Sequence, residues 1–174
     1  ANYLAYPELE PPFACLVVSG GHTTLIDVKD YTKMEILGTT LDDAAGECFD
    51  KVARVLDMPY PGGASLDKRA QQGKEGRYPM PRARAGENPL DMSFSGLKTA
   101  AINLIHNARQ KGEEIVVEDL CADFSAAVSD TLVPRAMALL KKTGYRKLAV
   151  AGGVAANSRI RRDILTAAEK LGAE

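Results

Sequence analysis

Apolar and polar residues alternate in two different ways over the first third of the sequence. Three short runs, 13–18, 23–28 and 34–37, are rich in apolar and β-branched residues, and only a few residues link one run to the next. Such runs predict strands, and links too short for a crossover helix predict an antiparallel β-meander. Residues 41–56 instead repeat apolar side chains every three or four positions, which predicts a helix with Thr40 as its N-cap.

The middle of the sequence alternates between helices and loops. Two prolines and two glycines end the first helix, and a short helix is expected over 64–72. Residues 73–90 carry further Gly and Pro among charged residues, which predicts an irregular loop. Two helices, 95–109 and 118–142, are expected to pair with one another. The second should be interrupted and kinked at Pro134, which lacks a backbone amide donor.

The last part of the sequence predicts a strand, a glycine turn and a helix. The apolar run 147–151 precedes two glycines, and a helix is expected from Ser158 onward. The length predicts a single α/β domain over 1–174. The chain starts at Ala1 without Met and ends within a predicted helix, so we expect this domain to be truncated at both ends. Its expected parts are a β-meander with one helix (13–56), an insertion of helices and loops (57–146), and a strand, glycine turn and helix (147–174).

Composition narrows the class of protein. The chain has 174 residues, 22 Lys and Arg against 23 Asp and Glu, a formal net charge of −1 and 45% hydrophobic residues, which is typical of a globular domain. No apolar run reaches the roughly 18 residues of a bilayer span, and no signal peptide pattern opens the chain, so we expect a cytoplasmic protein without a membrane partner. Cys15, Cys48 and Cys121 are widely spaced, which predicts reduced core residues rather than disulfides or a thiolate metal site.

Two glycine pairs follow predicted strands. Gly20–Gly21 and Gly152–Gly153 would let backbone amides approach an anion, and the second pair also precedes a helix N-terminus. The plainer interpretation is two ordinary turns, the second capped by Asn157 or Ser158. The sequence leaves both interpretations open.

Three carboxylates recur at helical spacing. Asp43, Glu47 and Asp50 stand at i, i+4 and i+7, which predicts a column on the polar face of the first long helix. One interpretation is a solvated face on which Arg54 pairs with Asp50 one turn away. The other is that Asp50 bonds a ligand hydroxyl or helps to hold a metal-bound nucleotide at the sheet edge.

A basic loop follows the short helix. Six basic residues face a single acid, Glu75, over this stretch: Lys68, Arg69, Lys74, Arg77, Arg82 and Arg84. With Tyr78 among them, the loop is a candidate contact for RNA phosphates, the alternative being a solvated loop with no partner. Arg159, Arg161 and Arg162 form a second small cluster on the last helix, where they are equally consistent with surface charge.

The residues themselves predict no metal centre. His22 and His106 stand far apart, and no HExxH or HxxxH pattern occurs, so no zinc-peptidase or iron site is recognisable. His22 follows the first glycine turn and is the better placed of the two for function.

Five motifs in this order resemble the TsaD/Gcp (YgjD) family of tRNA N6-adenosine threonylcarbamoyltransferases, formerly labelled O-sialoglycoprotein endopeptidases. The motifs are residues 17–23, 40–52, 60–63, 93–99 and 151–157. The resemblance implies one lobe of the actin-like, sugar-kinase-like (ASKHA, ribonuclease H-like) ATPase fold with a helical insertion. It also implies transfer of a threonylcarbamoyl group from threonylcarbamoyl-adenylate to N6 of adenosine 37, in tRNAs that read codons beginning with A.

The same resemblance implies site residues, although no catalytic residue is assigned. Asp50 and Gly63 would contact threonylcarbamoyl-adenylate or ATP from one wall, and Asn157 would hold the adenosine side. The opposite wall would be lined by Val17, Val18, Ser19, Gly20 and Gly21.

The family's metal ligands fall outside this chain. The resemblance implies an iron or zinc ion in the parent protein, held by a HxxxH pair before Ala1 and an aspartate after Glu174, so no metal is expected here. We therefore expect the chain alone to be inactive. The implied partners are tRNA and the other proteins of the threonylcarbamoyladenosine pathway, and the exposed lobe surface suggests a homodimer as a hypothesis.

Three alternatives remain at this point. The glycine turns alone would suit a sugar or acyl kinase-like ATPase lobe. The first helix and the basic loop would suit a non-catalytic module that binds a partner protein. The old label of metalloendopeptidase would require the histidine pair that this chain lacks.

Overall fold

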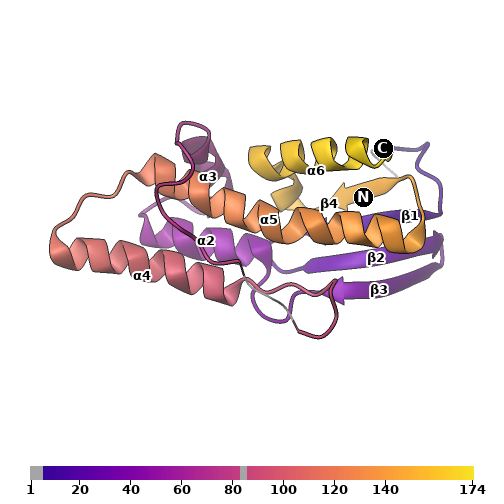
Figure 1. Cartoon of the computed structure of the whole chain (residues 1–174), viewed down its shortest axis with the longest axis horizontal. Coiled ribbons are helices and arrows are strands. Elements are labelled where there is room, and N and C mark those ends of the chain that lie inside the picture. The colour runs from indigo at the N-terminus through magenta and orange to yellow at the C-terminus, as the bar shows by residue number, and fades with distance from the viewer. Residues whose placement is uncertain (1–5, 83–85) are drawn as a thin grey trace.

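The structure, a computed structural model, describes residues 6–82 and 86–174, which form a four-stranded sheet and a group of helices (Figure 1). The strands are β1 (Phe13–Val18), β2 (Thr23–Asp30), β3 (Lys33–Thr39) and β4 (Leu148–Ala151). The first three form the predicted antiparallel meander, and β4 pairs with β1 in parallel, so that the order is β3-β2-β1-β4. The meander prediction is confirmed.

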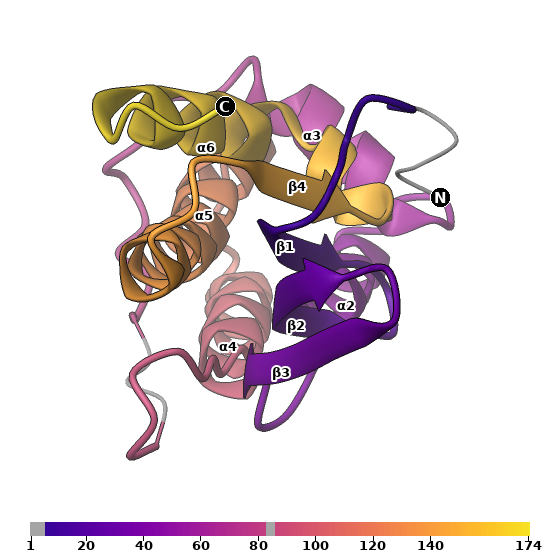
Figure 2. The ribbon, with the colours of Figure 1, turned by 90° about the vertical axis from the view of Figure 1, so that its right-hand side faces the viewer.

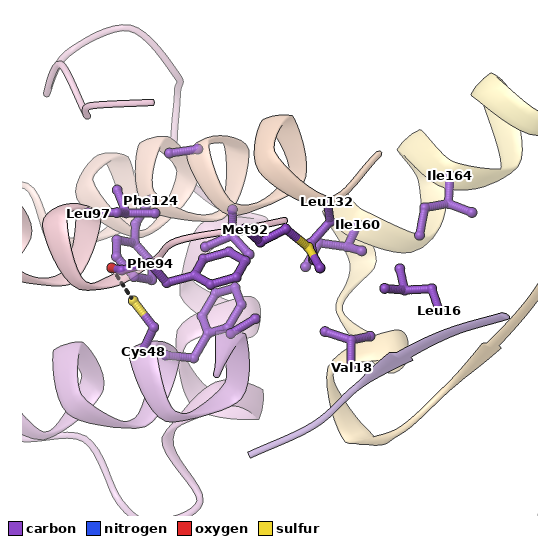
Figure 3. Packing of buried hydrophobic residues seen from close by; sticks show 14 of the residues in the cluster. Leu16, Val18, Cys48, Met92, Phe94, Leu97, Phe124, Leu132, Ile160 and Ile164 are labelled. Atoms are coloured by element: carbon purple, nitrogen blue, oxygen red, sulfur yellow. Dashed lines mark hydrogen bonds between the residues drawn. The ribbon is translucent and has the colours of Figure 1, made fainter. Parts of the chain in front are cut away.

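The two faces of the sheet carry apolar clusters of different size. Successive residues of a strand point to opposite faces. Leu16 of β1 accordingly joins the main core, whereas Phe13 and Cys15 join a small separate cluster with Val28 and Ala149. Figure 2 shows α4 and α5 together on one side of the strands. Figure 3 shows the main core where β1, the Met92–Phe94 segment and the helices meet.

The three cysteines are buried and free, as predicted. Burial raises the pKa of Cys15 to about 11 and raises the pKa of Cys48 and Cys121 to about 12. The thiols are therefore protonated at neutral pH and pack as small apolar side chains. The Cys48 thiol donates to the Phe94 carbonyl oxygen at 3.5 Å (Figure 3).

The first long helix begins later than its apolar pattern predicts. Helix α2 spans Ala45–Val55, not 41–56, and Thr40 is not its N-cap. The Thr40 hydroxyl instead donates to the Asp43 carbonyl oxygen at 2.7 Å, which organises the turn before the helix. The first helical amide, that of Ala45, donates to the side-chain oxygen of Thr23 on β2 at 2.9 Å. The cap therefore comes from a neighbouring strand, which a local search along the sequence cannot find.

The remaining helices lie close to their predicted positions. They are α3 (Gly62–Ala70), α4 (Ser95–Lys111), α5 (Val117–Thr143) and α6 (Ser158–Lys170), with a short 3₁₀ helix, η1 (Gly153–Ala156), before α6. Helix α3 begins two residues before its predicted start, because the side chain of Asp50 accepts from its first amides.

Two predictions about α5 need correction. The helix runs unbroken through Pro134, with buried Leu132 and Ala136 on either side holding it to the core (Figure 1). Its main helix neighbours are α3 and α6, while α4 lies mainly against α2, so the expected pairing of α4 with α5 is a minor contact. None of the described helices combines the length and apolarity needed to cross a membrane.

Candidate functional site

A cavity of about 320 Å³ opens where three turns meet. The turns follow β1, α2 and β4, which are far apart in sequence but adjacent in the fold. Four of the eight predicted site residues line the cavity: Gly20, Asp50, Gly63 and Asn157. The other four, which lie in β1 and the turn after it, are Val17, Val18, Ser19 and Gly21. Val18 is fully buried in the core.

The turn after β1 is closed by Ser19. The Ser19 side-chain oxygen accepts from the amides of Gly21 at 3.3 Å and His22 at 3.0 Å, and the Ser19 amide donates to the His22 carbonyl oxygen at 2.7 Å. The amide of Gly20 has no partner within residues 6–82 and 86–174. The turn interpretation therefore holds for Gly21 and His22, while the Gly20 amide stays available at the cavity.

Close backbone approach explains why glycine stands at position 46 on α2. The Gly46 amide donates to the Ser19 carbonyl oxygen at 3.1 Å. A Cβ at position 46 would lie 2.6 Å from the backbone nitrogen of Gly20 and from backbone atoms of Ser19. Any side chain there would push the turn away from the helix and change the cavity wall.

The turn after β4 crosses the end of β1. Gly152 has φ 103°, and a Cβ there would lie 2.2 Å from the Val18 carbonyl oxygen. The side chain of Asn157 accepts from the Ile160 amide at 3.1 Å and caps α6. Of the two predicted caps, Asn157 is the one that the fold uses, and it also lines the cavity.

The predicted carboxylate column is divided between two places. Asp43 precedes α2 and pairs with Lys51 and Lys98, and Glu47 pairs with Lys51 at 2.7 Å. Asp50 alone of the three lines the cavity. The column was predicted from a helix beginning at position 41, and the later start of α2 removes Asp43 from it.

Asp50 lines the cavity and forms hydrogen bonds through only one of its two carboxylate oxygens. Its Oδ1 accepts from the amides of Gly62 at 2.8 Å and Gly63 at 3.3 Å, the first turn of α3. Its Oδ2 has no partner in the described part of the chain, and no ion pair with Arg54 forms there. An acceptor without a partner is what a ligand hydroxyl needs.

The sequence interpretation missed Asp67. This carboxylate lines the cavity from α3 and accepts from Ser158, at 3.0 Å from the amide and 2.8 Å from the hydroxyl. It therefore ties α3 to the N-terminus of α6 and fixes the width of the cavity. Its spacing of four residues from Gly63 on a helix is a sequence signal that could have identified it.

Asp42, just before α2, resembles Asp50 in its bonding but lies outside the cavity lining. Its carboxylate accepts from the amides of Phe94 and Ser95 and from the hydroxyls of Ser93 and Ser95, at 2.5 to 3.2 Å. Partial burial would raise the pKa of Asp42, but these hydrogen bonds together hold the pKa below its ordinary value.

The basic loop is matched by acids from α5. Ion pairs join Arg69 to Glu118, Arg77 to Asp119 and Arg82 to Asp130. Backbone amides of the loop also donate to α5, that of Lys74 to Asp119 and those of Gly76 and Tyr78 to Asp123. The positive surplus along the sequence is therefore largely offset in space, and Arg84 lies outside the described residues.

The histidines and acids of this chain do not fit the implied iron or zinc ion. Within the described ranges, no three His, Cys, Asp or Glu side chains gather in a way that would hold a metal ion. His22 lies in the turn after β1 and His106 on α4.

Comparison with known proteins gives the family. Residues 1–174 match the family model described as TsaD, tRNA N6-adenosine threonylcarbamoyltransferase. Proteins of that name are 54% identical in Moorella thermoacetica, over 99% of this chain and 50% of the relative, and 52% identical in Caldicellulosiruptor bescii, over 94% and 48%. The relative from Clostridioides difficile is 47% identical, over 99% and 51%. The chain spans about half the length of the curated relatives it matches.

Solved structures give the fold. Component A of the Acidaminococcus fermentans (R)-2-hydroxyglutaryl-CoA dehydratase aligns with a TM-score of 0.54 at 18% identity, over 99% of this chain and 56% of that one. The activator of the Clostridium difficile 2-hydroxyisocaproyl-CoA dehydratase, with bound ADPNP, aligns with a TM-score of 0.53 at 15% identity, over 92% and 53%. These likenesses confirm the predicted α/β fold, which this chain shares with about half of each of these proteins.

Proposed function

Because this chain belongs to the TsaD family of tRNA N6-adenosine threonylcarbamoyltransferases, we propose that its cavity binds the adenylate part of threonylcarbamoyl-adenylate. The observation that carries the proposal is that one cavity is lined by both Asp50 and Gly20, whose Oδ2 acceptor and amide donor have no partner in the part of the chain that the structure describes. A ribose hydroxyl needs such an acceptor, and a phosphate needs such a donor.

The size and lining of the cavity support a nucleotide. Its volume of about 320 Å³ lies within the usual range for ligand pockets. Pro61, Val154 and Ala156 supply apolar surface for a base, and Asn157 supplies an amide group beside them. The activator that shares this fold was solved with bound ADPNP, which is consistent with a nucleotide at such a cavity.

The proposed reaction is acyl transfer to tRNA. The N6 amine of adenosine 37 attacks the carbamoyl carbon, a new N–C bond forms, the bond from that carbon to the adenylate oxygen breaks, AMP leaves and the amine loses a proton. The residues of this chain orient the adenylate, and backbone donors stabilise the charge that develops on the leaving phosphate. We assign no catalytic base.

Other parts of the proposal extend beyond this chain. We propose tRNA as the substrate and the other pathway proteins as partners, in the cytoplasm, for the longer protein represented by the relatives. The metal chemistry would likewise belong to residues outside this chain. The family match favours the transferase over a sugar or acyl kinase lobe, whose fold would be the same.

Calorimetric titration tests the proposal. ATP and a non-hydrolysable threonylcarbamoyl-adenylate analogue are titrated into the chain and into the variants Asp50→Ala and Asn157→Ala. Glu47→Ala is the matched control, because Glu47 lies on the same helix but pairs with Lys51 rather than lining the cavity. We expect binding that both site variants weaken and the control preserves. Absence of binding to the wild-type chain, or equal binding to all variants, would contradict the proposal.

A further inference from the structure

Tyr60 stands on the turn between α2 and α3 with its ring in solvent. It is 82% exposed, the most exposed large apolar side chain in the described part of the chain. It has no hydrogen bond, ion pair or ring contact within residues 6–82 and 86–174. Tyr78, by contrast, has an internal role, since its hydroxyl accepts from the Val116 amide at 2.9 Å. Packing therefore does not explain an aromatic residue at this position.

The turn that carries Tyr60 is held firmly. The next residues, Gly62 and Gly63, donate their amides to Asp50, and the Met58 amide donates to the Ala53 carbonyl oxygen at 2.9 Å. A Cβ on Gly62 would lie 2.3 Å from the Cβ of Ala53, so this part of the turn lies directly against α2. The ring is consequently presented from a fixed backbone, which lowers the entropy cost of stacking against a ligand.

The turn places Tyr60 next to the cavity lining, because Tyr60 directly precedes Pro61 in the chain. Pro61 and Gly63 line the cavity, whereas Tyr60 does not. The ring is therefore exposed to solvent and does not belong to the lining of the space proposed for the adenylate. A second molecule that approaches the bound adenylate past this turn would meet this ring.

An arginine without an ion pair in the described ranges stands six residues before Tyr60. Arg54 lies one turn beyond Asp50 on the same side of α2, and it is exposed and without an ion pair in the described ranges. Asp50, four residues before it, accepts through Oδ1 from the start of α3, and no ion pair between Asp50 and Arg54 forms in the described part of the chain. The nearby acid Asp57 is paired with Arg109 at 2.9 Å. An exposed aromatic ring that follows an unpaired arginine by six residues is a combination found on surfaces that bind single-stranded nucleic acid.

We propose that Tyr60 stacks on an unpaired base of the RNA substrate next to the cavity, with Arg54 neutralising a neighbouring phosphate. The inference rests on the proposed function and adds to it the residues that receive the RNA. Unpaired RNA loops are recognised by such stacking on aromatic side chains. The proposed function brings RNA to this cavity, and the unpaired Arg54 at the end of α2 suits an RNA phosphate better than an apolar protein surface.

The test uses an anticodon stem-loop RNA with 2-aminopurine beside the adenosine that the family modifies. Stacking quenches 2-aminopurine, so fluorescence reports ring contact directly, and titration gives the affinity. Tyr60→Ala should abolish the additional quenching and weaken binding about tenfold, whereas Tyr60→Phe should retain both. Arg54→Ala should lower the slope of log affinity against log salt by about one.

Tyr6→Ala is the matched control, since Tyr6 is 58% exposed but lines a different groove beside β4. If the Tyr60→Ala variant quenches 2-aminopurine fluorescence as strongly as the wild type does, the inference is overturned, and a protein partner would remain as the alternative ligand of the ring. Absence of RNA binding by the wild type would overturn it as well. ATP titration of the same samples separates the two proposals, because loss of ATP binding defeats the proposed function, whereas Tyr60→Ala should leave ATP affinity unchanged.

Discussion

Asp42 and Asp50 stand eight residues apart, and the carboxylate of each accepts hydrogen bonds from the first amides of a different helix. Neither α3 nor α4 has a capping side chain at its own N-cap, and each receives one of these carboxylates from before or within α2. Asp42 uses both oxygens, for four hydrogen bonds at the start of α4. Asp50 uses only Oδ1 at the start of α3.

The difference between the two aspartates lies in how much of each carboxylate the fold uses. A carboxylate has room for about four hydrogen bonds, so Asp42 is fully used and Asp50 is not. Only Asp50 also lines the cavity. The same capping geometry stabilises both helices, and at Asp50 it also holds in place the second carboxylate oxygen that the proposed function assigns to a ligand.

The largest expected effect breaks the junction that Asp50 organises. Gly62→Ala would place a Cβ 2.3 Å from the Ala53 Cβ, so α2 and α3 must separate. We expect a loss of about 3 kcal/mol in the free energy of unfolding, as for an overpacked core. Urea denaturation of the wild type and the variant measures this difference in the free energy of unfolding. A variant as stable as the wild type would show that this contact is not tight.

Removal of Asp42 comes second. Asp42→Ala leaves two amides and two hydroxyls at the start of α4 without their acceptor. We expect a loss of about 2 kcal/mol, at the upper end for a helix cap, with nucleotide affinity unchanged for the protein that remains folded. Weakened binding in the folded variant would contradict the assignment of Asp42 to structure alone.

Acid should weaken the Asp42 contribution specifically. Because the folded-state pKa of Asp42 is lowered, its stabilisation is complete above the unfolded pKa and is lost as pH falls through the folded value. The stability difference between wild type and Asp42→Asn should therefore shrink from neutral pH to about pH 3. Urea unfolding at both pH values measures the difference. A constant difference would mean that the hydrogen bonds do not depend on the charge.

How far the sequence predicts these features depends on where each partner lies. The strand 13–18 and the α6 cap Asn157 were predictable because alternation and capping are local patterns. The start of α2 was not, because its cap is Thr23 on another strand. The two aspartates look alike in sequence, and only the fold shows that Asp42 reaches Phe94, more than fifty residues away.

The charge of the basic loop and the role of Asp67 also depend on contacts with residues that are distant in the sequence. The surplus counted over the loop was correct as arithmetic, yet Asp119 and Asp123 on α5 bind the loop from more than forty residues away. Asp67 was missed because its hydrogen-bond partner, Ser158, lies 91 residues away in the sequence. Residues 17–21, 50, 63 and 157 came from the family resemblance, and their binding roles stay predictions.

The smallest expected change in the free energy of unfolding is that of Gly63→Ala, in contrast to Gly62→Ala. The nearest atom to a Cβ at position 63 is the Phe49 Cβ at 3.9 Å, so Ala fits without a clash. Gly63→Ala should raise stability by about 0.5 kcal/mol, because alanine favours the helix, while its methyl group narrows the cavity and weakens ATP binding. Thermal unfolding and calorimetry measure the two effects. Unchanged ATP affinity would place the ligand away from this wall.

The most direct test of the account changes one oxygen of Asp50. Asp50→Asn keeps an Oδ1 acceptor for Gly62 and Gly63 but replaces the partnerless Oδ2 with an amide donor. Calorimetry and urea unfolding on this variant should show about tenfold weaker ATP binding, with a stability loss much smaller than that of Asp42→Ala. Unchanged ATP affinity together with a large loss of stability would show that Asp50, like Asp42, only holds a helix.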